Sequence, residues 1–196
     1  MKVALFFVQP EGRGPETPVY FLYGKYHICG FMFIREDRVE AFCTWAGHEY
    51  TRFDWGRANN GRFVTANHVD FMILSVDEEE GAKLLKTCEA CEQVKKPFNL
   101  RDLLLMYAPF REMEELTVDL APTLNNTQAV IVMLRACLRT DNRLMEGLEG
   151  LHSRQTLMET LYDRLLPFAL PVTWANITGL VQWPVEERQP ESRAVH

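Results

Sequence analysis

His27 is the residue whose type and position most suggest chemistry. It lies in Tyr26-His27-Ile28-Cys29-Gly30-Phe31-Met32-Phe33, a segment rich in aromatic residues that predicts a strand. Alternate residues of a strand point to opposite faces, so His27, Cys29 and Phe31 are expected to share one face. An imidazole inside such a strand lowers stability unless it is hydrogen-bonded or used in a reaction. Taken alone, it is more often a satisfied core histidine than a catalytic one.

The second candidate feature is the start of an apolar helix expected over residues 127–139. Cysteine hydrolases place their nucleophile in the first turn of a buried helix, where the helix N-terminus lowers the thiol pKa and backbone N–H groups bind an oxyanion. Here the segment 124–130 contains no cysteine. Asn126 is an ordinary N-cap residue, and the hydroxyl of Thr127 needs a strong base before it can attack. Cys137 lies about 15 Å further along the helix, too far to substitute.

The order of these parts resembles the circularly permuted papain-like cysteine peptidases of the NlpC type, in which the histidine strand precedes the cysteine helix. His27-Ile28 with Gly30-Phe31 looks like the histidine strand of that family. Leu120-Ala121-Pro122, followed by Asn126-Thr127-Gln128-Ala129-Val130-Ile131, is similar to its nucleophile segment. The similarity covers approximately residues 19–166, with 151–166 as an accessory helix. Asn126 stands where the family has its cysteine, and an amide has no ionisable thiol.

This resemblance implies a non-catalytic relative of the permuted papain-like hydrolases. Such a protein would act as a binding or structural protein with a protein partner, and the layout also points to a virus-encoded source. His27, Asn126 and Thr127 would then form a vestigial site. Glu40 on the next strand, or His48, would stand where active relatives orient the histidine.

Two other hypotheses stay open. The first is an active cysteine hydrolase of peptide, amide or ester bonds, with Cys29 or Cys43 as nucleophile and His27 or His48 as base. Both cysteines lie in expected strands and lack the helix N-terminus that would lower their pKa. The second is an interaction module without enzyme ancestry, whose core includes a histidine.

The sequence predicts neither a metal site nor a cofactor. Cys88 and Cys91 form a Cys-x-x-Cys pair, but a structural zinc needs four ligands and no second pair stands at a suitable spacing. Both thiols fall on the apolar stripe of their helix, where cysteine behaves as a small hydrophobic residue. The acidic run 77–80 is expected to be a solvated first helical turn.

The elements that would position these residues follow from the spacing of apolar side chains. The first half predicts strands at residues 2–8, 19–23, 26–34, 39–45, 50–55 and 69–76, with a hairpin over 26–45. The second half predicts helices at 77–96, 99–107, 127–139 and 153–166, of which 127–139 is apolar on every side and therefore buried all round. The expected fold is α+β, with an N-terminal antiparallel, partly barrel-like sheet packed against a buried central helix and flanking helices.

Length and composition indicate one papain-like domain over residues 1–180 and a disordered tail over 181–196. The chain has 196 residues, 47% of them hydrophobic, and a net charge of −6. No run of Lys or Arg exceeds two residues, so nucleic-acid binding is not expected. No stretch approaches the roughly 20 apolar residues of a membrane span. An odd number of cysteines and the lack of a signal-peptide pattern indicate an intracellular location, cytoplasmic or nuclear.

Overall fold

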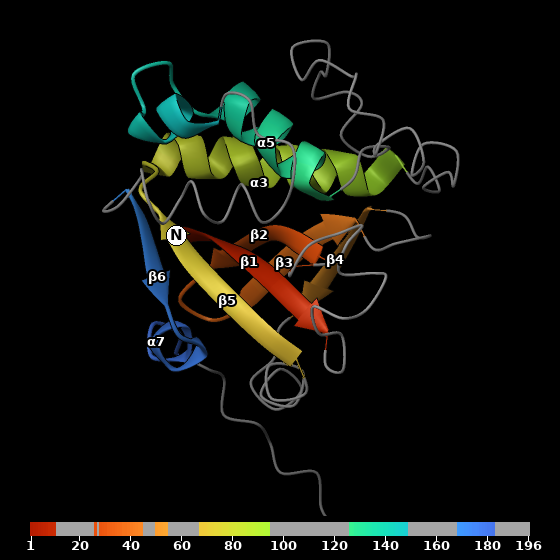
Figure 1. Cartoon of the computed structure of the whole chain (residues 1–196), viewed down its shortest axis with the longest axis vertical. Helices are drawn as coiled ribbons and strands as arrows, with labels where there is room; N and C mark the ends of the chain where they lie inside the picture. The colour runs from red at the N-terminus through yellow and green to blue at the C-terminus, as the bar shows by residue number, and fades with distance from the viewer. Residues whose placement is uncertain are drawn as a thin grey trace, which may run out of the picture.

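One antiparallel sheet forms the centre of the described part of the chain (Figure 1). The computed structural model describes residues 1–10, 26, 28–44, 50–54, 67–94, 126–148 and 168–182. Six strands pair in the order β4-β3-β2-β1-β5-β6, and every neighbouring pair is antiparallel. The strands are β1 Lys2–Pro10, β2 Ile28–Ile34, β3 Val39–Thr44, β4 Tyr50–Asp54, β5 Asn67–Leu74 and β6 Ala169–Val172. Among these strands β4 and β6 are the two edges, so the sheet is open.

The expected hairpin is confirmed by β2 and β3. The two strands pair with Phe31 opposite Phe42, and the Arg35 N–H donates to the carbonyl of Arg38 across the turn at 2.9 Å. The turn consists of charged residues between two apolar runs, which is why its position could be read from the sequence.

β1 is buried on both faces because it lies in the middle of the sheet and is apolar throughout. The side chains of residues 3–8 are at most 3% exposed. Val3, Leu5 and Phe7 belong to one hydrophobic cluster, and Ala4, Phe6 and Val8 belong to another on the opposite face. A short continuous apolar run is typical of such a two-sided strand.

Two antiparallel helices, α3 (Glu78–Val94) and α5 (Asn126–Cys137), cover one face of the sheet (Figure 1). The Lys83 ammonium donates to the carbonyl of Ala136, and the Cys88 thiol lies 3.9 Å from the Met133 sulfur. Residues 129–134 of α5 are all buried, which confirms the expectation of a helix buried all round. The α+β class is confirmed. None of the helices that the structure describes is long and apolar enough to cross a membrane.

The end of the described chain returns to the sheet as an edge strand and a short helix. After the 3₁₀ helix η3 (Arg143–Gly147) and a gap in the described residues, β6 pairs with β5, and α7 (Trp174–Thr178) follows. Ile177 and Val181 are buried in the cluster on the face opposite α3 and α5, and the Gln182 N–H donates to the carbonyl of Glu36. Val181 and Gln182 therefore belong to the folded part, two residues beyond the expected boundary at 180.

Several expected elements lie outside the described residues. They are the strand at 19–23, the helices at 99–107 and 153–166, and the tail beyond residue 182.

Candidate functional site

The strand and the helix that the sequence assigns to one site pack against each other. β2 is the strand that α5 contacts most. Asn126 and Thr127 are the first two residues of α5, but their side chains lie outside what the structure describes, as do His27 and His48. The structure thus brings together the two elements, while the geometry between the imidazole and the helix start stays a prediction.

The thiols are the groups that decide whether a cysteine hydrolase is possible. All five cysteines of the chain fall within the described residues, and all five are free and buried. Cys29 belongs to the cluster under α3 and α5, whereas Cys43 belongs to the cluster on the opposite face, so one base could not serve both. Burial, and to a smaller extent the neighbouring Cys29, raises the pKa of the Cys43 thiol. A raised pKa leaves less of the thiolate that would act as nucleophile.

The cysteines of the Cys-x-x-Cys pair are core residues of the helix layer. Cys88 is 0% exposed and Cys91 is 5% exposed, and both pack in the cluster that contains the apolar residues of α5. The Cys137 sulfur lies 3.3 Å from the Thr87 hydroxyl. Burial raises the pKa of the Cys137 thiol, whereas the contact with Thr87 acts to lower it. Among the described residues no group of three or more His, Cys, Asp or Glu is placed to hold a metal ion.

Glu40, the expected orienting carboxylate, is buried among arginines. Its Oε2 lies 3.2 Å from Arg35 Nε and 3.3 Å from Arg38 Nε, and its Oε1 lies 3.3 Å from Arg52 Nη1. The contact between Arg35 Nε and Glu40 Oε2 is close enough for an ion pair but is not aligned as a hydrogen bond. Glu40 therefore has a structural role as the partner of these arginines, and its action on His27 stays a prediction.

Arg52 continues this charge network from the sheet to α3. Its Nε and Nη2 donate to Glu92 Oε2 at 3.1 and 2.8 Å, and its guanidinium carbon lies 5.3 Å from the centre of the Phe42 ring. Because Arg52 also pairs with Glu40, one guanidinium joins a buried carboxylate of β3 to the second half of α3. The arginines are thus already paired with carboxylates, which does not favour an additional anion at this place.

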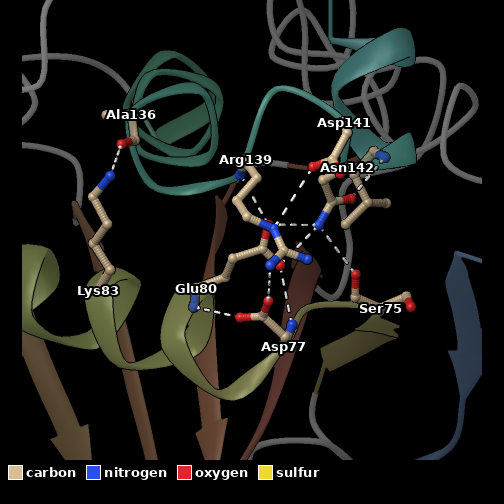
Figure 2. Close-up of polar contacts among 9 residues, drawn as sticks. Ser75, Asp77, Glu80, Lys83, Ala136, Arg139, Asp141 and Asn142 are labelled. Carbon is tan, nitrogen blue, oxygen red and sulfur yellow. Dashed lines mark hydrogen bonds and ion pairs between the residues drawn. The ribbon is translucent and has the colours of Figure 1, made fainter.

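A second buried carboxylate, Glu80, joins the start of α3 to the end of α5 (Figure 2). Its Oε1 accepts hydrogen bonds from the Arg139 backbone N–H at 2.8 Å and from Asn142 Nδ2 at 3.0 Å. Its Oε2 accepts from the Asp77 N–H at 3.0 Å and again from Asn142 Nδ2 at 2.9 Å. The Asp77 carboxylate accepts from the Glu80 N–H in return, which completes a capping box at the start of α3.

The prediction that residues 77–80 form a solvated turn is wrong for Glu80, which is only 3% exposed. Glu78 and Glu79 are exposed as expected. Burial would raise the pKa of Glu80, but hydrogen bonds from Arg139, Asn142 and Asp77 outweigh burial and lower it. Because donors already surround both oxygens, this carboxylate acts as a structural link and is not available as a catalytic base.

His68 and Asp70 form a polar pair on β5 that the sequence analysis did not single out. The Tyr26 hydroxyl donates to Asp70 Oδ2, and His68 Nε2 lies 3.3 Å from Asp70 Oδ1. Two polar residues alternate here with Val69 and Phe71, so the period of two that places them on one face was visible in the sequence. Tyr26 directly precedes His27 in the chain, so its hydrogen bond to Asp70 joins the residue next to the expected histidine to β5.

The fold and the polar clusters define an α+β protein with an antiparallel sheet and a two-helix layer. Comparison of the chain with protein-family models, with curated proteins and with solved structures finds no match.

Proposed function

We propose that the chain is a non-catalytic relative of the permuted papain-like cysteine hydrolases and acts inside cells as a binding or structural protein with a protein partner. The observation that carries the non-catalytic part is the burial of every thiol in the chain. A cysteine hydrolase needs a thiolate that substrate can reach, and no residue of this chain offers one.

The proposed ancestry has support from the helix layer. α5 begins at Asn126 and packs on β2, the strand that follows His27. That arrangement agrees with a nucleophile helix facing a histidine strand after loss of the nucleophile. The intracellular location has support from five free cysteines, which a reducing compartment keeps unpaired.

Thiol labelling tests this proposal against the active-hydrolase alternative. The native protein is treated with iodoacetamide near pH 6 and analysed by mass spectrometry, with a sample denatured and labelled at mildly alkaline pH as control. We expect no labelling of the native protein and five labels after unfolding, because all five thiols are buried. Rapid, selective labelling of Cys29 or Cys43 in the native protein would instead identify a nucleophile and contradict the proposal.

A further inference from the structure

The last described segment, residues 169–182, ties one edge of the sheet to the turn between β2 and β3, and we call it the C-terminal strap. It begins with β6, which pairs with β5, and continues as α7 (Figure 1). It ends where the Gln182 N–H donates to the carbonyl of Glu36 at 2.6 Å. Since β1 lies between β5 and β2 in the sheet, the strap joins parts of the sheet that are not neighbours.

Few apolar side chains hold the strap to the sheet. Of its residues only Ala169, Ile177 and Val181 are buried, and the others are exposed or partly buried. Trp174 adds a ring contact to Phe71 of β5, with 5.9 Å between the ring centres. In α5, by contrast, residues 129–134 are all buried. The apolar area that stabilises the strap is therefore small beside that of the helix layer.

The backbone of the strap also has little stability of its own. β6 has four residues, and one of them is Pro171, which has no N–H to donate to β5. α7 has five residues, and a helix this short does not form without packing against the rest of a protein. The Gly179 N–H donates to the carbonyl of Ala175 at 3.1 Å, and both residues are exposed. Hydrogen bonds near solvent and sparse burial are typical of segments that open locally.

The polar contacts that fix α7 lie within the strap. The Asn176 N–H donates to Thr173 Oγ1 at 3.2 Å, and the Thr173 N–H donates to Asn176 Oδ1 at 3.0 Å. Both residues are exposed. The capping box of α3 is different, because its Glu80 also accepts from the Arg139 N–H beyond the end of α5. Opening of the strap would therefore leave the polar links of the helix layer intact.

We infer that the C-terminal strap opens as one unit while the rest of the described fold stays intact. Opening removes Ile177 and Val181 from the second apolar cluster, takes Trp174 off Phe71 and frees the outer edge of β5. The strap is then a conformational device that exposes part of one sheet face without global unfolding. This inference goes beyond the proposed function and depends neither on the hydrolase ancestry nor on the thiols.

Hydrogen exchange of the full-length protein, followed by mass spectrometry, tests the inference. Amides of β6 and α7 should exchange with similar protection, at least about tenfold less than the amides of β1 and α5. Low concentrations of urea should accelerate exchange in β1 and α5 steeply and in the strap only slightly, because opening the strap exposes little surface.

Two variants that each lose an N-terminal cap provide a matched pair. Thr173→Ala weakens the cap of α7 and should speed exchange in both β6 and α7 about fivefold. Asp77→Ala weakens the cap of α3 and should speed exchange in β1 and α5. It should leave the strap unchanged, because the open and closed states both contain the start of α3.

Three results would overturn the inference. The first is a strap that is as protected, or as steeply dependent on urea, as β1 and α5. The second is an equal acceleration of the strap and β1 in Asp77→Ala, since the strap would then open only by global unfolding. The third is an acceleration in Thr173→Ala that is confined to α7, which would show fraying of one helix in place of a unit that includes β6.

Discussion

Glu80 is the residue whose loss should cost the fold most among the acidic side chains of α3. Replacement by Ala removes the buried acceptor for the Arg139 N–H, the Asp77 N–H and Asn142 Nδ2, and leaves these partly buried donors without it. We expect Glu80→Ala to lower the free energy of unfolding by about 3 kcal/mol. Glu79→Ala, one residue away and exposed, should change it by less than about 0.5 kcal/mol. Chemical unfolding monitored by circular dichroism measures both, and equal effects would contradict the structural role of Glu80.

The lowered pKa of Glu80 also predicts a dependence of stability on pH. Because the folded state holds this carboxylate ionised more strongly than the unfolded chain does, the unfolded chain takes up the proton first as the pH falls. The contribution is therefore complete above the ordinary Glu pKa of about 4.3 and is lost as the pH falls through the lower folded value. The stability difference between wild type and Glu80→Gln should be largest near neutral pH and shrink below about pH 4. Unfolding curves at a series of pH values would show this, and a difference independent of pH would exclude it.

Glu40 should matter for a different reason, namely that it is the common partner of three cations. Glu40→Ala leaves Arg35, Arg38 and Arg52 near one another without the buried carboxylate, and we expect a loss of about 3 kcal/mol in unfolding free energy. Asp37→Ala is the control, because Asp37 pairs with Arg38 at the surface and should contribute less than about 1 kcal/mol. A tolerated Glu40→Ala would show that the arginine contacts do not hold this end of the sheet.

Single polar residues were the least predictable part of the molecule. The burial of Glu80 depends on Arg139 and Asn142, about 60 positions later in the chain, and no local pattern marks that contact. Glu40 could be placed on its strand, but the convergence of Arg52 from the next strand needs the register of β3 and β4. His68 and Asp70, by contrast, alternate with apolar residues and could have been found from the sequence.

At the scale of elements, Gly30 is required by the close approach of β2, β3 and β1. A Cβ at this position would lie 2.2 Å from the Phe42 carbonyl oxygen and 2.7 Å from the Cys43 Cβ. The backbone of β3 at Phe42 cannot shift without disturbing the pairing of the strands. We therefore expect Gly30→Ala to lower the unfolding free energy by at least about 2 kcal/mol.

Gly179 provides the matched control for Gly30. Its φ is −69°, and a Cβ there would meet nothing closer than 3.5 Å. Gly179→Ala should be neutral or stabilise by up to about 1 kcal/mol, because Ala restricts the unfolded chain. Thermal unfolding of the two variants side by side measures the contrast, and comparable losses would contradict the packing at β2.

The elements themselves were largely predictable wherever the apolar spacing was continuous. β1 to β5, α3 and α5 all lie at or within about two residues of their expected bounds. β6 and α7 were missed because β6 has four residues, one of them Pro171, and α7 has five. Elements this short carry too few residues for a period to show, and their position is set by pairing with β5 and by the capping box of Thr173 and Asn176.

At the scale of the whole molecule, the two faces of the sheet are covered by different elements. The face under α3 and α5 holds the larger apolar cluster, the two buried carboxylates and the elements assigned to the vestigial site. The opposite face carries α7, whose Ile177 is buried in the second apolar cluster.

Hydrolysis assays on the full-length protein test the central claim most directly. Wild type and His27→Ala are incubated with a panel of peptide, amide and ester probes, after circular dichroism has established that both are folded. The proposed function predicts product formation at the rate of a protein-free blank for both proteins. Turnover by the wild type that disappears in His27→Ala would contradict it, since His27 would then be part of a functional active site.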